Sequence, residues 1–323
     1  MSIDVLKSGA LSQLQDLGRW GWQRYGVVVA GAMDPWSHRC ANALVGNADT
    51  EATLEMTLVG PSLRFRHALV MAICGADLAP RIGSRPVPLN RALVVRAGAQ
   101  LDFGPRRAGV RAYLAVRGGF AVAPQMGSRS THVRSGLGGL HGRALEKGDV
   151  LPVRPTAAAT SAEQTRLERA DCARLHPAGP VAPRIWPEGS LRVMAGPQWG
   201  LFGEAAQAAF VGAGFRVEAQ SDRMGLRLFG PALQYRHPFD MISEGVTLGT
   251  IQVPPDGQPI LLMADRQTTG GYPKIAHVAS VDLPRVAQCA PGEVLRFESI
   301  SLAMAQHLYL QREQAFARWR ASL

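Results

Sequence analysis

Short apolar runs, each closed by a glycine or a proline, constrain the fold of this chain more than any other feature of its sequence. The 323 residues include 35 glycines and 22 prolines, and both residue types disfavour the interior of a helix. Short runs separated by such turn residues are typical of strands in β-barrels and β-sandwiches. We therefore predict a mainly β fold with a few short helices. The predicted strands are Ser62–Phe65, Leu69–Ile73, Gln100–Phe103, Arg111–Val116, Leu191–Ala195, Thr247–Val253, Ile260–Met263 and Val294–Phe297.

Local signals predict two helices. Asp34 is a suitable N-cap, Pro35 suits the first helical position, and Gly46 ends the helix. The predicted core face of this helix consists of Trp36, Cys40, Ala41, Leu44 and Val45. A second helix is predicted from Ser301 onward, packed on the surface.

The length of the chain predicts about two domains. Prolines are concentrated in the segment 154–188, where few core contacts are expected to cross, so the domain boundary is placed there. We predict an N-terminal β-barrel-type domain over 1–160, a Pro-rich linker over 161–188 and a C-terminal domain over 189–323.

Composition and motif searches exclude several classes of protein. All but three of the 35 cationic residues are arginines, and they are scattered, so the net charge of +10 does not predict a nucleic-acid surface. The most apolar stretch, 68–79, is interrupted by Gly75 and Asp77 and is too short to span a bilayer. The four cysteines form no CxxC pair, and no zinc spacing or GxSxG elbow occurs. The first residues lack the apolar region of a signal peptide, so we expect none. We expect a reduced, cytoplasmic protein with no metal site and no nucleic-acid or membrane partner.

The polar run from Asp265 to Lys274 is the most unusual segment of the sequence. It follows a predicted strand and contains the double glycine Gly270–Gly271, whose backbone N–H groups would suit carboxylate or phosphate oxygens if the chain turned sharply there. The spacing of a Walker A loop is missing. A lysine in a chain that prefers arginine suggests that a compact ammonium is needed, and the alternative is an ordinary hairpin turn.

Other runs offer further candidate groups. Glu244 beside Gly245 is either a general base or an ordinary turn carboxylate. Near the N-terminus, Asp16 could pair with Arg19, and Glu55 is either on the outward face of a strand or a buried, partnered acid. The glycine-rich segment 136–139, preceded by Ser128, Ser130 and Thr131, is predicted to be a mobile loop that could act as a lid.

Several of these runs resemble one protein family. The matching motifs are QDLGR (Gln15–Arg19), GAMD (Gly31–Asp34), AN-LVGN (Ala41–Asn47), LE-TL-GP-L-F (Leu54–Phe65), SDRMG-RL-G (Ser221–Gly230), SEG---G-IQVP (Ser243–Pro254) and D-QTTGGYPKIA (Asp265–Ala276). In this order they resemble the biotin-dependent carboxyltransferase / allophanate hydrolase subunit 2 family over nearly the whole chain, apart from Arg154–Glu188. The resemblance implies two cyclophilin-like β-barrel domains and a reaction site formed with another subunit.

The resemblance also implies three alternative functions. The chain is similar to the C subunit of an ATP-dependent 5-oxoprolinase, which would use ATP to activate the lactam of 5-oxoproline for hydrolysis to L-glutamate, together with a KipI-like B subunit and a lactam-hydrolase-like A subunit. The second function is carboxyl transfer in a urea or amide carboxylase, which would need a biotinylated partner because no Met precedes any of the three lysines. The third is a KipA-type regulatory protein that antagonises a kinase inhibitor.

For the first function, we hypothesise roles for particular residues, most of them in the longest of these motifs. We expect Lys274 and the Gly270–Gly271 backbone to hold a phosphate or the substrate carboxylate, with Asp265 or Glu244 holding the lysine or acting as a base. Gln267, Thr268 and Thr269 would orient the amide. The expected substrate-binding set is completed by Tyr272, Arg223 and Gln252.

Overall fold

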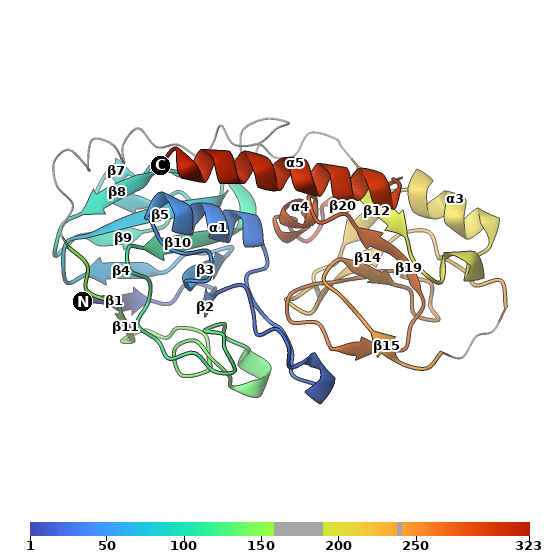
Figure 1. Ribbon diagram of the computed structural model, residues 1–323, viewed down its shortest axis with the longest axis horizontal. Coiled ribbons are helices and arrows are strands. Elements are labelled where there is room, and N and C mark those ends of the chain that lie inside the picture. Colours follow the sequence, from blue (N-terminus) through green and yellow to red (C-terminus); the bar gives the residue numbers. More distant parts are fainter. Residues whose placement is uncertain (158–189, 238–240) are drawn as a thin grey trace. The chain divides into compact units, whose positions relative to one another are not determined.

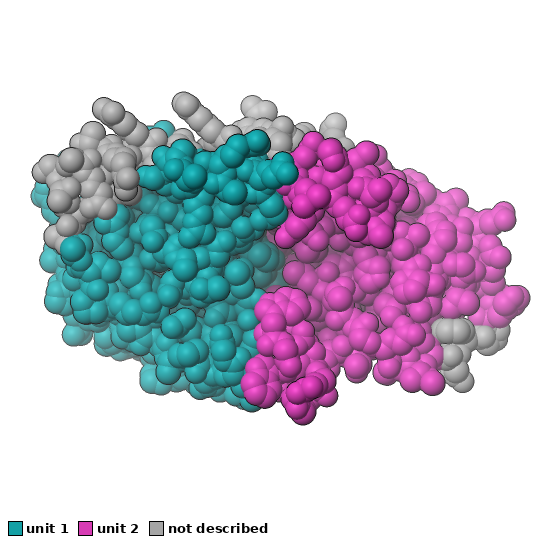
Figure 2. Space-filling model, viewed as in Figure 1, with its two compact units in different colours: residues 1–19, 30–185, 313–323 teal, residues 20–29, 186–312 magenta. Residues whose placement is uncertain are grey.

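The computed structural model describes residues 1–157, 190–237 and 241–323, and strands dominate it, as the mainly β prediction requires (Figure 1). The chain divides into two compact units (Figure 2). Unit 1 comprises Met1–Arg19, Ala30–Ile185 and Glu313–Leu323, and unit 2 comprises Trp20–Val29 and Trp186–Arg312. The predicted domains, 1–160 and 189–323, assign Trp20–Val29 and Glu313–Leu323 differently, and the predicted linker 161–188 lies outside the described residues.

Unit 1 contains two antiparallel sheets. The first has the order β11 (Val150–Pro152), β1 (Ser2–Lys7), β4 (Ser62–Phe65), β9 (Gln100–Asp102), β6 (Arg81–Ile82) and β7 (Arg85–Pro86). The second has the order β2 (Leu11–Gln15), β3 (Thr53–Thr57), β10 (Ala108–Val116), β5 (Leu69–Asp77) and β8 (Ala92–Val95). Both sheets contribute to one apolar core, for example through Val5 and Leu63 from the first and Ile73 and Leu114 from the second.

Helix α1 (Pro35–Leu44) covers the other face of the second sheet (Figure 1). Alternate residues of a strand point to opposite faces, so Ile73 enters the core between the sheets while Cys74 packs with α1. Asp34 caps the helix, since its Oδ1 accepts a hydrogen bond from Ser37 N at 2.9 Å, and Gly46 follows the helix with a φ of 78°. The predicted bounds and buried face of this helix are confirmed.

Unit 2 is built on one sheet of eight strands. Its order is β20 (Val294–Leu295), β13 (Phe215–Val217), β14 (Gly225–Phe229), β17 (Ile260–Leu262), β16 (Thr250–Gln252), β19 (Lys274–Val278), β12 (Leu191–Ala195) and β21 (Phe297–Ser299). Only Arg296 separates β20 from β21, although these strands lie at opposite ends of the order. The sheet must therefore curl until its ends meet, which is the geometry of a barrel.

Short elements complete the described part of the chain. A separate ribbon pairs β15 (Glu244–Gly245) with β18 (Thr269–Gly270). The other helical elements are α3 (Glu204–Gly212), α4 (Leu283–Ala287), α5 (Leu302–Ala321), η1 (Gln23–Tyr25), η2 (Val133–Ser135) and η4 (Trp199–Leu201). Helix α5 confirms the predicted C-terminal helix, and Ser301 caps it through its side-chain oxygen. Among the described residues, no helix combines the length and apolar character needed to cross a bilayer.

Candidate functional site

A salt bridge between Lys274 and Glu244 lies at the centre of the candidate site in unit 2. Lys274 is the first residue of β19, which is paired on both sides, by β16 and by β12. Its Nζ donates to Oε2 of Glu244, and the lysine side chain is 7% exposed whereas the glutamate side chain is 50% exposed. This hydrogen bond and the ammonium charge hold the pKa of Glu244 below its usual value. A carboxylate held ionised is a weak base at neutral pH, so the geometry favours Glu244 as the residue that holds the lysine.

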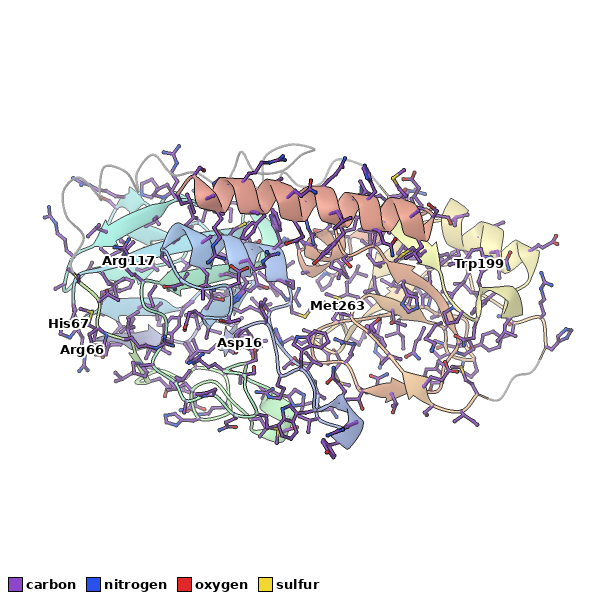
Figure 3. The ribbon with its side chains drawn as sticks, in the orientation of Figure 1. Asp16, Arg66, His67, Arg117, Trp199 and Met263 are labelled. Atoms are coloured by element: carbon purple, nitrogen blue, oxygen red, sulfur yellow. The ribbon has the colours of Figure 1, made fainter. Side chains whose placement is uncertain are left out.

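Gln198, which no sequence motif had indicated, connects both members of this pair. Its Oε1 accepts a hydrogen bond from the backbone N of Lys274 at 3.1 Å, and its Nε2 donates to Glu244 Oε2 at 3.5 Å. Gln198 directly precedes Trp199, which is labelled in Figure 3. Gly196 makes the approach possible, because a Cβ at this position would lie 2.1 Å from the carbonyl oxygen of Lys274. The available signal was the Gly-Pro-Gln turn directly after a predicted strand.

Gln252 lies beside Lys274 in the sheet. The two residues are directly opposite in the β16–β19 pair, next to a β-bulge, so their side chains are expected on the same face. Nε2 of the buried Gln252 donates to the carbonyl oxygen of Tyr272 at 2.9 Å. A Cβ on Gly270 would lie 2.6 Å from this Nε2, so the position requires glycine for space.

Gln267 continues this hydrogen-bonded chain. Because Gln252 uses its Nε2 on a backbone carbonyl, its Oε1 is the atom available to Gln267, whose Nε2 donates to it at 3.4 Å. The Oε1 of the half-buried Gln267 accepts no hydrogen bond from any residue within the described ranges. The site therefore presents a hydrogen-bond acceptor, which suits a ligand with an N–H group.

The Gly270–Gly271 pair does not form the sharp turn that the sequence predicted. Neither glycine has a φ in the left-handed region, and Gly270 belongs to strand β18. The two glycines therefore do not form the αR–αL type of anion-binding nest. Thr268 is half-buried, while Thr269, Gly271 and Tyr272 are exposed.

Arg223 and Asp265 form a pair of their own. Nε and Nη2 of Arg223 donate to the two carboxylate oxygens of Asp265 at 2.9 Å each, and both side chains are buried. The backbone N of Asp265 also donates to the carbonyl oxygen of Arg223 at 2.8 Å. Two acids were expected near Lys274. Glu244 forms a salt bridge with Lys274, whereas Asp265 forms one with Arg223.

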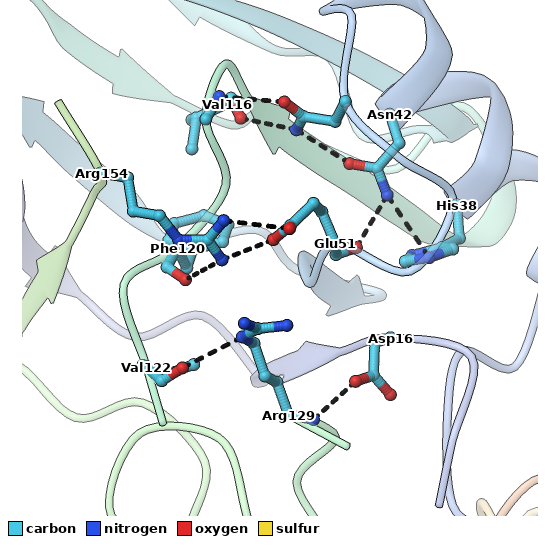
Figure 4. Close-up of polar contacts among 11 residues, drawn as sticks. Asp16, His38, Asn42, Glu51, Val116, Phe120, Val122, Arg129 and Arg154 are labelled. Carbon is cyan, nitrogen blue, oxygen red and sulfur yellow. Dashed lines mark hydrogen bonds and ion pairs between the residues drawn. The ribbon is translucent and has the colours of Figure 1, made fainter. Parts of the chain in front are cut away.

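In unit 1, Asp16 organises the predicted mobile loop. Its Oδ1 accepts hydrogen bonds from the hydroxyls of Ser128 and Ser130 at 2.6 Å each, and Figure 4 shows Arg129 N donating to the same carboxylate. Arg19 donates to the carbonyl oxygen of Ser130. These serines and Thr131 are fully buried, so the residues that precede the predicted lid are anchored to the protein interior. Gly136 itself is exposed, and a mobile lid at 136–139 stays a prediction.

The other motif residues of unit 1 are also tied into the fold. Nδ2 of Asn47 donates to Oδ1 of Asn42 at 3.0 Å, and Arg154 pairs with Glu51 (Figure 4). The buried Glu55 accepts a hydrogen bond from the hydroxyl of Tyr113 at 2.8 Å. Of the two alternatives predicted for Glu55, the structure therefore shows the buried, partnered acid. We therefore place the candidate site in unit 2. In the described ranges, no group of three His, Cys, Asp or Glu side chains could hold a metal ion.

The fold and this cluster define a mainly β protein with a nearly closed sheet and a polar site on that sheet. The chain belongs to the carboxyltransferase domain, subdomain A and B, family, which matches residues 25–299. It is 35% identical to the 5-oxoprolinase C subunit of Haemophilus influenzae, over 96% of this chain and 95% of that protein. It is 34% identical to the 5-oxoprolinase C subunit of Escherichia coli, over 98% of both. The crystal structure of K. lactis urea amidolyase matches with a TM-score of 0.87 and 30% identity, over 98% of this chain and 20% of that one.

Proposed function

We propose that the chain is the C subunit of an ATP-dependent 5-oxoprolinase and helps to activate the lactam of 5-oxoproline for hydrolysis to L-glutamate. The observation that carries this proposal is the match to two 5-oxoprolinase C subunits over at least 95% of each protein, at 35% and 34% identity. Urea amidolyase resembles the chain over only a fifth of its own length. The partners would be a KipI-like B subunit and a lactam-hydrolase-like A subunit, assembled in the cytoplasm.

The geometry in unit 2 supports a role in binding and orienting the lactam. Oε1 of Gln267 can accept the lactam N–H, and the Lys274 ammonium can hold an anionic group or stabilise negative charge as it develops. ATP, bound in the assembled complex, would supply the phosphoryl group that activates the lactam oxygen. Thr268 and Thr269 precede Gly270 along the same polar run and would complete the contacts to the amide.

The test is phosphate release from ATP by the chain mixed with its partner subunits, with and without 5-oxoproline. Lys274→Met should lower the 5-oxoproline-dependent rate by about 10²–10³-fold, the usual effect of removing one charge-stabilising donor. Lys147→Met is the matched control, because Lys147 is exposed and lies in unit 1. Both variants should still assemble, as measured by size-exclusion chromatography. Turnover near the unmodified rate in Lys274→Met would contradict the assignment of the site.

Carboxyl transfer to an amide is a second candidate, favoured by the structural match to urea amidolyase. The chain would then receive the carboxyl group from a biotin carried by a partner. Stimulation of ATP turnover by urea together with a biotinylated partner, and none by 5-oxoproline, would replace the first proposal with this one. A stable complex stimulated by neither would point to the KipA-type regulatory role.

A further inference from the structure

We propose that Nζ of Lys274 and Nε2 of Gln198 form a subsite for an anionic group of the ligand, and that Glu244 fills this subsite when no ligand is bound. The inference deepens the proposed function and rests on it only for the identity of the ligand. The shared chemistry is a carboxylate or phosphoryl oxygen.

The two donors converge on one oxygen atom. Both Lys274 Nζ and Gln198 Nε2 donate to Oε2 of Glu244. The carboxamide of Gln198 is oriented by the backbone, because its Oε1 accepts the N–H of Lys274, and this leaves its Nε2 facing the anion. The two donors would therefore stay in place if the glutamate left.

Glu244 is held much less firmly than the donors. Lys274 starts a strand with a hydrogen-bonded neighbour on each side, whereas Glu244 lies in the two-residue strand β15, which among the described strands pairs with β18 alone. A two-stranded ribbon is only marginally stable by itself. The glutamate side chain is also half exposed and regains water when it moves, but the buried ammonium needs another anion. Replacing Glu244 by a ligand anion therefore costs less free energy than moving Lys274 would.

The neighbouring groups narrow the class of ligand. Gln267 presents an acceptor for an N–H group, and its hydrogen-bonded neighbour Gln252 lies opposite Lys274 in the β16–β19 pair. A molecule that carries both an amide N–H and a carboxylate satisfies both needs, as 5-oxoproline does. Urea and 2-pyrrolidinone offer the N–H group and lack the anion.

The experiment measures binding to the full chain by calorimetry with three probes: 5-oxoproline, 2-pyrrolidinone and inorganic phosphate. Glu244→Gln removes the resident anion and should lower the Kd of 5-oxoproline by about tenfold or more, equivalent to about 1.4 kcal/mol. Glu244→Asp, with a shorter side chain, should shift it in the same direction. The control Glu293→Gln makes the same charge change at an exposed acid of unit 2 and should leave the Kd unchanged.

The three probes distinguish the sources of the anion. If Glu244→Gln lowers the Kd of 5-oxoproline but not that of 2-pyrrolidinone, the subsite binds the ligand carboxylate. If it lowers only the Kd of phosphate, the subsite binds a phosphoryl group. Adding Lys274→Met to Glu244→Gln should remove the gain in either case. The inference would be overturned if the Kd of 5-oxoproline and the Kd of phosphate were each the same in Glu244→Gln, Glu244→Asp and the unmodified chain. Because binding needs no turnover, this result is independent of whether the complex hydrolyses 5-oxoproline.

Discussion

Gln252 and Gln267 are joined end to end, with Nε2 of Gln267 donating to Oε1 of Gln252 at 3.4 Å. The second carboxamide group of this chain is anchored in turn, because Nε2 of Gln252 donates to the carbonyl oxygen of Tyr272 at 2.9 Å. A backbone carbonyl can only accept, so it sets the direction of both side-chain amides. The outermost carboxamide, that of Gln267, therefore offers its Oε1 to a ligand that carries a hydrogen-bond donor.

Gln252→Leu should leave Gln267 free to rotate. We expect the KM for 5-oxoproline in the assembled complex to rise by about five- to tenfold, which corresponds to the loss of one hydrogen bond of about 1 kcal/mol, while kcat changes less. Gln220→Leu, at an exposed glutamine of unit 2, is the control and should leave both constants unchanged. A fall in kcat with an unaltered KM would instead assign Gln252 to the chemical step.

The two adjacent glycines offer a matched pair of substitutions. In Gly270→Ala the new Cβ would lie 2.6 Å from Nε2 of Gln252, so the carboxamide must move and the KM should rise as in Gln252→Leu. In Gly271→Ala the nearest atom, Oγ of Ser243, is 3.4 Å away and the backbone needs no left-handed φ, so kinetics should be unaffected. Steady-state kinetics of complexes that carry each variant measures the two KM values. Equal changes in KM would refute the prediction that Gly270 is required to leave space for Gln252.

Breaking the pair of Arg223 and Asp265 should destabilise unit 2. Asp265→Asn leaves a buried guanidinium without its anion, which costs about 3–5 kcal/mol in unfolding free energy. The double change Arg223→Met/Asp265→Leu should recover much of that loss, because it removes both charges together. Urea unfolding followed by circular dichroism measures each variant. If Asp265→Asn kept full stability but lost activity, Asp265 would be a functional residue.

His38 should make unit 1 sensitive to mild acid. Burial lowers the pKa of this imidazole from its ordinary 6.5, and this effect outweighs the opposing backbone hydrogen bond to Asp49 and the nearby carboxylates of Asp16, Asp49 and Glu55. The folded state binds a proton less readily than the unfolded state, so its stability is complete above pH 6.5 and declines as the pH falls through the lowered value. His38→Gln should flatten this decline in urea-unfolding midpoints measured between about pH 7 and 5. An equally steep decline in the variant would exclude His38 as its source.

Local signals made the helices predictable, whereas the site depends on pairing over long distances. The cap at Asp34 and the stop at Gly46 act within one helix, so the sequence alone locates α1. Glu244 and Lys274 are 30 residues apart and meet only because β15 pairs with β18, and Gln198 is 76 residues before Lys274. Residue types in the polar run indicated a site, but the partner of each group could not be read from spacing.

Two of the strand predictions that differ from the structure do so for reasons that the backbone shows. The predicted strand Thr247–Val253 is shortened to Thr250–Gln252, because Thr247 N donates back to Oγ1 of Thr250 and Gly249 adopts a φ of 84°. The predicted strand Val294–Phe297 becomes β20 and β21, because the chain leaves β13 and joins β12 within this run. An apolar run shows no sign of such a change of partner.

The continuity of β20 and β21 has a consequence for how unit 2 can be recognised. An open sheet offers its outermost strand to any extended segment that can add to it through backbone hydrogen bonds. Here both ends of the sheet are one short run of the chain, so its free backbone groups are few and interrupted at Arg296. A protein that binds this sheet must recognise its side chains and loops, which makes the contact dependent on the sequence of unit 2.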